Sequence, residues 1–255
     1  MTTIAIAGKG GTGKTTVAGL LIKYLRDKNE GSVLAIDADP SANLNAVLGL
    51  PLESTVGDIR EETLARVGSG SMQAGVAKQD YLDYRINEAL VEGPGVDLLA
   101  MGRPEGPGCY CAANNMLRVI IDRLAKSYSY VVIDNEAGLE HLSRRTTRDV
   151  DVLLIVSDPT LRGITAAGRV VEVINELKTK VGRHYLVINR ADGELPRAIS
   201  EAIARYGLNL IGSVPVDDAV AAFDAVGKPT VDLPPEAPAY RAVRVIAEKV
   251  FNGSL

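Results

Sequence analysis

Residues 8–15 read Gly-Lys-Gly-Gly-Thr-Gly-Lys-Thr, which matches the pattern G-x-x-x-x-G-K-[ST]. The stretch follows a short apolar run at 4–7 and precedes a segment whose apolar residues recur at helical spacing. Glycines let a backbone curl until its N–H groups point at phosphate oxygens, and a helix N-terminus adds partial positive charge. We therefore predict that Lys14 bridges the β- and γ-phosphates of a nucleotide and that Thr15 completes the shell of a Mg²⁺ ion. A glycine-rich structural turn is the alternative.

Short apolar runs recur along the chain, with helical patterns between them. They lie at 4–7, 33–36, 131–133, 152–156, 185–188 and 208–214. Continuous rather than alternating hydrophobicity is typical of strands covered on both faces of a parallel sheet. Two sets of apolar residues carry helical spacing between the runs: Val17, Leu20, Leu21, Tyr24 and Leu25, then Val170, Val173, Ile174 and Leu177. The alternation predicts an α/β fold with a doubly wound, mostly parallel sheet and helices on both faces.

The length favours one domain. A chain of 255 residues and 27.0 kDa hides roughly 70% of its unfolded surface on folding, enough for a core without metal or disulfide support. We expect a single domain over 1–255, with a helical insertion and a mobile loop at about 51–95 and a two-cysteine loop at about 102–112. The proline-rich stretch 231–238 is expected to connect to a terminal helix over 240–251.

Composition excludes several classes of function. The formal net charge of −4 and the aromatic content of 4% argue against a nucleic-acid partner, which needs positive charge and stacking faces. No apolar run approaches the roughly 20 residues of a membrane-spanning helix, and the first residues lack the pattern of a signal peptide. We expect a cytoplasmic protein without a membrane span.

Lys9 adds a second lysine to the phosphate loop. With it, the sequence Gly-Lys-Gly-Gly-Thr-Gly-Lys-Thr-Thr at 8–16 resembles the deviant Walker A motif of the MinD, ParA, arsenical-pump ATPase and nitrogenase iron-protein group. The resemblance implies a P-loop NTPase of the SIMIBI type that hydrolyses ATP with Mg²⁺. It also implies a homodimer in which Lys9 reaches across to the ATP of the partner subunit. A solvated lysine near the phosphates is the alternative.

Two acidic segments lie where this group has its switches. Asp37-Ala38-Asp39-Pro40 ends the second apolar run and is similar to switch I, which implies that Asp39 orients the attacking water and contributes to the Mg²⁺ site. An aspartate that caps the next helix is the alternative, and it suits Asp37 better than Asp39.

The second acidic segment, 131–134, resembles a Walker B strand. The resemblance implies that Asp134 holds Mg²⁺ through water and that Gly138 moves its backbone in switch II when the γ-phosphate leaves. The following Asn-Glu-Ala-Gly departs from the usual D-x-P-A-G or D-x-G-A-G form, so the role of Glu136 in switch II is open.

Asn189 and Arg190 follow the fifth apolar run and look like the group's adenine-reading segment, with a strand-end turn as the alternative for Asn189. Pro215-Val216-Asp217 resembles the later segment that lines the base. The expected nucleotide-binding residues are Gly8, Lys9, Gly10, Gly11, Thr12, Gly13, Lys14, Thr15, Thr16, Asn189, Arg190, Pro215 and Asp217. The expected catalytic residues are Lys9, Lys14 and Asp39, and those at Mg²⁺ are Thr15, Asp39 and Asp134.

The two cysteines, Cys109 and Cys111, flank one tyrosine and follow Gly-Pro-Gly at 106–108. Soft tetrahedral metal sites have four ligands, so one chain supplies half a site and a two-fold dimer supplies the whole. We predict a shared site for Ni²⁺ or Zn²⁺ on the dimer axis; an iron–sulfur cluster on the same thiols and a pair of buried, unliganded cysteines are alternatives.

The C-x-C pair, together with Gly-Leu-Glu-His-Leu-Ser-Arg at 138–144, resembles the CooC-type carbon monoxide dehydrogenase accessory ATPases. The resemblance implies nickel insertion into a nickel-dependent carbon monoxide dehydrogenase or an acetyl-CoA synthase component. His141 is a tempting metal ligand, but a place on a helix after switch II is the preferred interpretation. An electron-transfer reductase and a MinD- or ParA-like positioning ATPase are the alternative functions.

Overall fold

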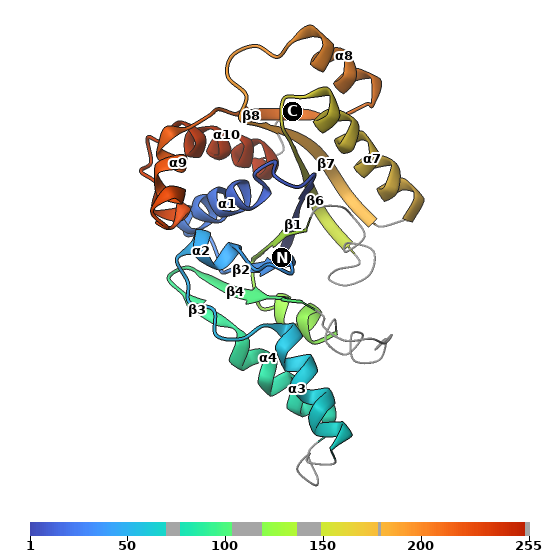
Figure 1. Ribbon diagram of the computed structural model, residues 1–255, viewed down its shortest axis with the longest axis vertical. Coiled ribbons are helices and arrows are strands. Elements are labelled where there is room, and N and C mark those ends of the chain that lie inside the picture. Colours follow the sequence, from blue (N-terminus) through green and yellow to red (C-terminus); the bar gives the residue numbers. More distant parts are fainter. Residues whose placement is uncertain (70–76, 104–118, 137–148, 178–179, 253–255) are drawn as a thin grey trace.

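The computed structural model describes residues 1–69, 77–103, 119–136, 149–177 and 180–252. Within these ranges the strands form an eight-stranded sheet of order β3-β4-β2-β5-β1-β6-β7-β8 (Figure 1). The strands are β1 (Thr2–Gly8), β2 (Val33–Asp37), β3 (Val91–Gly93), β4 (Val96–Ala100), β5 (Tyr130–Asp134), β6 (Asp149–Ser157), β7 (Lys180–Asn189) and β8 (Leu210–Val214). All neighbouring pairs are parallel except β3 with β4.

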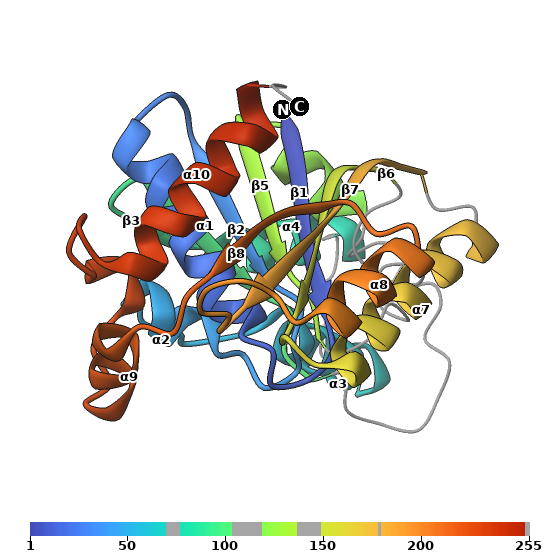
Figure 2. The same cartoon turned by 90° about the horizontal axis from the view of Figure 1, so that it is seen from above.

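Helices cover both faces of the sheet, as the sequence predicts. The helices include α1 (Lys14–Lys28), α2 (Leu44–Leu48), α3 (Val56–Gly68), α4 (Lys78–Ala89), α7 (Leu161–Leu177), α8 (Arg197–Arg205), α9 (Asp218–Ala225) and α10 (Pro238–Asn252), with the 3-10 turn η1 (Thr230–Asp232). Residues 119–125, before β5, are also helical. Helices α1 and α10 lie on one face and α7 and α8 on the other (Figure 2). Alternate residues of β1 enter the two cores: Ile4 and Ile6 pack with α1, and Ala5 and Ala7 lie in the opposite cluster. The doubly wound fold is confirmed.

The region at 51–95, predicted to be helical, contains α3, α4 and the short strand β3. The sequence interpretation missed β3 and β4, which form an antiparallel hairpin at the sheet edge. Asp97 interrupts the apolar run of β4; its carboxylate accepts a hydrogen bond from the Tyr128 hydroxyl at 2.7 Å. In Figure 1 the α3–α4 pair extends away from the sheet beyond β3 and β4.

The backbone after β4 connects this helical arm to β2. The Met101 amide donates to the carbonyl oxygen of Asp37 at 2.8 Å, and the Gly57 amide donates to the Met101 carbonyl oxygen at 2.9 Å. Helix α3 begins with a capping box between Thr55 and Asp58. The start of α3 is therefore fixed to the carboxyl end of β2. Among the described residues, no helix is both long and apolar enough to cross a bilayer.

Candidate nucleotide site

The carboxyl ends of the central parallel strands meet at one edge of the sheet, where ligands bind in open α/β folds. β1 ends at Gly8, and the loop that follows leads directly into α1. Gly8 has φ 149°, and a Cβ there would collide with the Val156 carbonyl oxygen, so this position requires glycine. Helix α1 has no side-chain cap at its N-terminus and no acidic residue in its first turn. Its first N–H groups and its dipole are therefore available to an anion.

The phosphate loop is folded over its own lysine. The Thr12 hydroxyl donates to the Lys9 carbonyl oxygen at 2.9 Å, and the Lys14 Nζ lies 3.5 Å from the same oxygen. Lys14 is buried, whereas the Lys9 side chain is exposed. The environments of the two lysines thus differ: Lys14 faces the interior of the loop, and Lys9 lies at the surface.

Asp37 and Asp134 are register neighbours on β2 and β5. One carboxylate oxygen of Asp37 accepts from the Asp39 amide at 3.1 Å, and the other accepts from the Leu44 amide at 2.8 Å. Asp37 therefore caps α2, which is the alternative that the sequence left open. Burial raises the pKa of its carboxyl, and the two backbone hydrogen bonds oppose that shift.

Asp39 lies at the start of the loop after β2 and is half-buried. Its Oδ1 accepts from the Ser41 amide at 2.8 Å, in a local turn. Among the described residues, the second carboxylate oxygen of Asp39 accepts no backbone hydrogen bond. Asp39 lies on the same edge as Asp134, since its charge raises the pKa of the Asp134 carboxyl.

Asp134 is 1% exposed, and its Oδ1 has no hydrogen-bond partner among the described residues. Burial raises its pKa to about 7; the Thr15 hydroxyl and the Lys14 charge lower it, while the charges of Asp37 and Asp39 raise it. A buried carboxylate oxygen without a partner is costly unless a ligand completes it. Its neighbours are a lysine and a hydroxyl, the groups that flank a Mg²⁺–phosphate centre in P-loop proteins. These residues fit a hydrated Mg²⁺ ion.

Asn189 and Arg190 contact the phosphate loop from the end of β7. The Asn189 Nδ2 donates to the Thr12 carbonyl oxygen at 2.8 Å, and Arg190 donates to the Gly11 carbonyl oxygen at 3.2 Å from a backbone at φ 58°. Since the Asn189 nitrogen faces the loop, its amide oxygen is the atom left to accept a hydrogen bond. An acceptor suits the amino group of adenine better than the carbonyl oxygen of guanine.

A cavity of about 150 Å³ opens beside these residues. Its walls come from the start of α1, the end of β7, the segment after β8 and one side of α9. Pro215 and Thr16, two of the expected nucleotide-binding residues, line it. Sequence reasoning missed the contribution of α9, including Asp224, because its eight residues carry no motif and bury no side chain.

Asp217 lines the same cavity, but its carboxylate is engaged elsewhere. One oxygen accepts from the Ala219 amide at 2.9 Å and caps α9; the other accepts from the Ala239 amide at 2.8 Å in the first turn of α10. Both oxygens are thus occupied by backbone, and the structure gives Asp217 a positioning role in the cavity wall.

Several predicted residues fall outside the described ranges: Cys109, Cys111, Gly138 and His141. Glu136 is the last described residue after β5 and is half-buried. The metal loop and most of switch II therefore remain predictions.

Comparison with known proteins identifies the family. The family model of the CobQ/CobB/MinD/ParA nucleotide-binding domain matches residues 3–231. The chain is 49% identical over 249 residues to an uncharacterized ATP-binding protein of Methanocaldococcus jannaschii, covering 98% of each chain. It is 35% identical over 243 residues to the carbon monoxide dehydrogenase accessory protein CooC of Rhodospirillum rubrum, covering 91% of this chain and 90% of that one.

Among solved structures, the septum site-determining protein MinD of Pyrococcus horikoshii in complex with Mg-ADP matches with a TM-score of 0.69 at 22% identity, covering 98% of this chain and 96% of that chain. This likeness shows the same fold. Together with the phosphate loop and its buried carboxylate, the family match leads to one conclusion: the chain belongs to the CobQ/CobB/MinD/ParA family of P-loop nucleotide-binding proteins.

Proposed function

We propose that the protein is a dimeric ATPase that carries a metal ion for the maturation of a nickel enzyme. The observation that carries the ATPase part is the buried Asp134 carboxylate, which keeps one oxygen without a partner while the Thr15 hydroxyl and the Lys14 charge lower its pKa. Bound Mg²⁺ supplies charge neutralisation for the β- and γ-phosphates. Thr15, Asp134 and Asp39 are the residues that would hold its shell.

In the proposed hydrolysis, Asp39 orients a water molecule toward the γ-phosphorus. A new P–O bond forms as the bond to the β-phosphate oxygen breaks, which gives ADP and inorganic phosphate. Lys14 stabilises the charge that develops on the leaving oxygen, and Lys9 does the same for the ATP of the partner subunit. The exposure of Lys9 in the single chain supports a role across a dimer interface.

The metal part of the proposal depends on Cys109 and Cys111. Two chains would offer four thiolates, a set that suits Ni²⁺ or Zn²⁺ as cargo. The 35% identical relative is a carbon monoxide dehydrogenase accessory protein, which supports a nickel-dependent carbon monoxide dehydrogenase or an acetyl-CoA synthase component as client. ATP binding would close the dimer and change the metal affinity of the shared site, and hydrolysis would open the dimer again.

One experiment tests both parts on the same sample. The thiol-reduced protein is loaded anaerobically with Ni²⁺ and desalted; nickel, zinc, iron, sulfide, oligomeric state and ATP hydrolysis are then measured. We expect about one nickel or zinc ion per dimer by the four-thiolate argument, with hydrolysis that Asp39→Ala abolishes and the double variant Cys109→Ser, Cys111→Ser retains. That double variant should lose the metal.

Other outcomes separate the alternatives. Iron with matching sulfide would identify an electron-transfer reductase. A protein that hydrolyses ATP and dimerises without binding any metal would contradict the cargo role and favour a positioning ATPase. If Asp39→Ala hydrolyses ATP at the normal rate, the assignment of switch I is wrong.

A further inference from the structure

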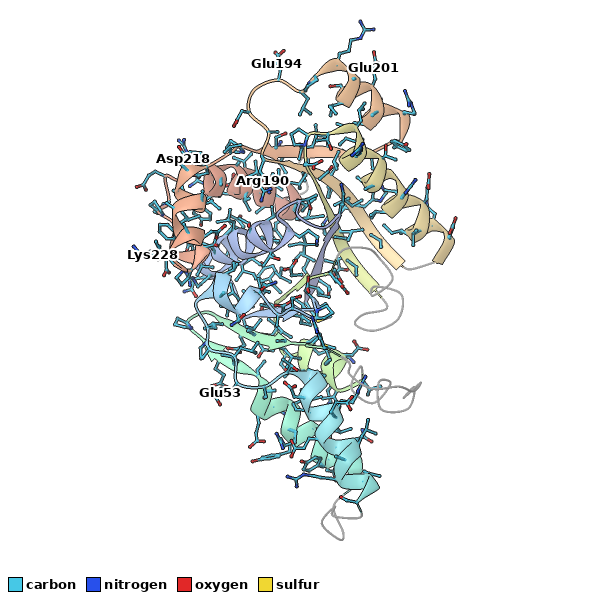
Figure 3. All side chains as sticks on the ribbon, viewed as in Figure 1. Glu53, Arg190, Glu194, Glu201, Asp218 and Lys228 are labelled. Atoms are coloured by element: carbon cyan, nitrogen blue, oxygen red, sulfur yellow. The ribbon has the colours of Figure 1, made fainter. Side chains whose placement is uncertain are left out.

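A second cavity, of about 420 Å³, lies at the amino ends of the parallel strands. Its walls come from the end of α1, the loop before β2, the β3–β4 hairpin and the segment before β5. In Figure 3, Arg190 marks the phosphate-loop end of α1, whereas Arg26, in the last turn of that helix, lines the second cavity. Small-molecule pockets are typically about 300–1,000 Å³ in volume. The cavity therefore has the size of a small-molecule site, at the edge of the sheet opposite the nucleotide site.

Arg26 brings a positive charge to this wall with few protein partners. Among the described residues, its guanidinium donates one long hydrogen bond, to the Val231 carbonyl oxygen at 3.4 Å, and lies 4.0 Å from the Asp27 carboxylate. Gly95 has φ 77° and lets the hairpin approach the Arg26 stem, since a Cβ there would lie 2.8 Å from Arg26 Cγ. A guanidinium has five N–H donors, so most of those on Arg26 are available to an anionic group in the cavity.

Asp97, on β4, brings the opposite charge to the same cavity. Its Oδ2 accepts from the Tyr128 hydroxyl at 2.7 Å, and its Oδ1 accepts from the Gly93 amide at 3.4 Å. Burial and the hydrogen bond to Asp97 raise the pKa of Tyr128, so the phenol stays protonated and remains the donor. A carboxylate has about four acceptor positions, so Asp97 can accept further hydrogen bonds from a cationic group in the cavity.

The two charges together restrict the chemistry of a ligand. A simple anion paired with Arg26 would be repelled by Asp97, and a simple cation paired with Asp97 would be repelled by Arg26. A molecule that carries both charges can form a charge-assisted hydrogen bond with each side chain, and each bond offsets the loss of water from its ionic group. The lining thus favours a zwitterion over either single ion.

We propose that this cavity binds a small zwitterion of the amino-acid or short-peptide class, with its carboxylate on Arg26 and its ammonium group on Asp97. The site is separate from the nucleotide site, and the inference does not depend on the proposed function. Helix α1 and strand β2 run from this cavity to the phosphate loop and to Asp37, so the two ligands would contact opposite ends of the same elements.

The test titrates the full ¹⁵N-labelled chain with glycylglycine and follows the backbone amide shifts. Two analogues isolate the charges: N-acetylglycylglycine lacks the ammonium group, and glycylglycinamide lacks the carboxylate. Glycine, N-acetylglycine and glycinamide repeat the series at a shorter separation of the charges. In at least one series the zwitterion should bind about tenfold more tightly than either analogue, the effect of one charge-assisted hydrogen bond. The largest shifts should lie at Gly31 and Gly95, which line the cavity.

Two variants assign the charges. Arg26→Gln should weaken the zwitterion about tenfold and leave glycylglycinamide unchanged, whereas Asp97→Asn should weaken the zwitterion equally and leave N-acetylglycylglycine unchanged. Arg241→Gln is the matched control, because it removes an exposed arginine that does not line the cavity. It should change none of the affinities. Thermal unfolding and ADP affinity, which depend on the other edge of the sheet, check that each variant folds normally.

Three results would overturn the proposal. They are equal affinities for the zwitterion and its analogues in both series, shifts confined to residues outside the cavity, and wild-type affinity for the zwitterion in both Arg26→Gln and Asp97→Asn. If one variant fails to fold, the other variant and the two ligand series on the wild-type protein still decide the question.

Discussion

The switch side of the site, around Asp37 and Asp134, keeps one buried carboxylate oxygen without a partner, whereas both carboxylate oxygens of Asp217 on the nucleoside side are hydrogen-bonded. Both oxygens of Asp37 accept from backbone amides, one in the loop after β2 and one at the start of α2, and both oxygens of Asp217 accept from amides at the starts of α9 and α10. Asp134 is as deeply buried as Asp37 but keeps one oxygen without a partner, and its pKa is raised to about 7. The three aspartates near the ends of parallel strands are therefore of two kinds. Asp37 and Asp217 position the backbone, whereas Asp134 has an oxygen that only a ligand can satisfy.

The first prediction concerns a variant that lacks the Asp134 carboxylate, whose Oδ1 has no hydrogen-bond partner among the described residues. Asp134→Asn should lower the affinity for Mg²⁺ in the presence of ADP by about 10- to 100-fold, the usual effect of losing a group that orients a hydrated metal. At pH 8 and without Mg²⁺ the same variant should unfold at a higher urea concentration than the wild type, because it no longer buries an uncompensated charge. Magnesium titration and urea unfolding measure the two effects. A variant that loses stability without Mg²⁺ would show that Asp134 is a structural carboxylate.

The second prediction concerns a variant that lacks the Asp217 carboxylate, both of whose oxygens accept hydrogen bonds. Asp217→Ala should lower the free energy of unfolding by about 2 kcal/mol, since one capping hydrogen bond is worth about 1 kcal/mol and Asp217 supplies two. Urea unfolding measures the loss. Asp218→Ala, which removes the neighbouring exposed carboxylate, should change stability by less than about 0.5 kcal/mol. Equal losses in the two variants would refute the double-cap interpretation.

The third prediction uses pH to separate the two kinds of carboxylate. The folded-state pKa of Asp134 is raised to about 7 from an ordinary value of 3.8, so the folded protein binds this proton more tightly than the unfolded chain does. The contribution of Asp134 to stability is therefore largest at low pH and is lost as the pH rises through 7. Protons and Mg²⁺ compete for the same carboxylate, so Mg²⁺ affinity should fall about tenfold per unit below pH 7.

Titrations of Mg²⁺ from pH 5.5 to 8.5 check the third prediction, and Asp134→Asn provides the background from protonation of the nucleotide itself. Above about pH 8 the two curves of Mg²⁺ affinity against pH should run parallel, with the wild type still binding Mg²⁺ more tightly. Below pH 7 the two curves should approach one another. Parallel profiles over the whole range would mean that Asp134 does not titrate near neutrality.

The sequence predicted the features that depend on residues close together in the chain. It missed the features that depend on contacts between residues far apart in the chain. The phosphate loop and the central strands follow from local pattern, because a parallel strand buried on both faces is continuously apolar. Strand β4 was missed because Asp97 breaks its apolar run, and its partner Tyr128 lies 31 residues away. Asp217 was assigned to the base segment by resemblance, and its contact with the Ala239 amide was not foreseen because Ala239 lies 22 residues away. Asp224 was missed because only the packing of α9 brings it to the cavity.

The last prediction concerns the connection from the switch side to the α3–α4 arm. Gly102 follows Met101, whose amide donates to the Asp37 carbonyl oxygen. Gly102 has φ 62°, and a Cβ added there would meet the Thr55 side chain that caps α3. Gly207 has φ 60° with open space around it, so Gly207→Ala carries the backbone strain alone, about 1 kcal/mol. Gly102→Ala should cost about 1 kcal/mol more, the value of a disturbed cap.

Urea unfolding of the two glycine variants gives the difference, and amide hydrogen exchange shows where it acts. Exchange should rise at the start of α3 in Gly102→Ala and not in Gly207→Ala, because only the former displaces Thr55. If the two variants lose equal stability and α3 stays protected in both, the arm is not held to the switch side through Met101. A selective effect would mean that Asp37 holds two elements, α2 through its carboxylate and the α3–α4 arm through its carbonyl oxygen.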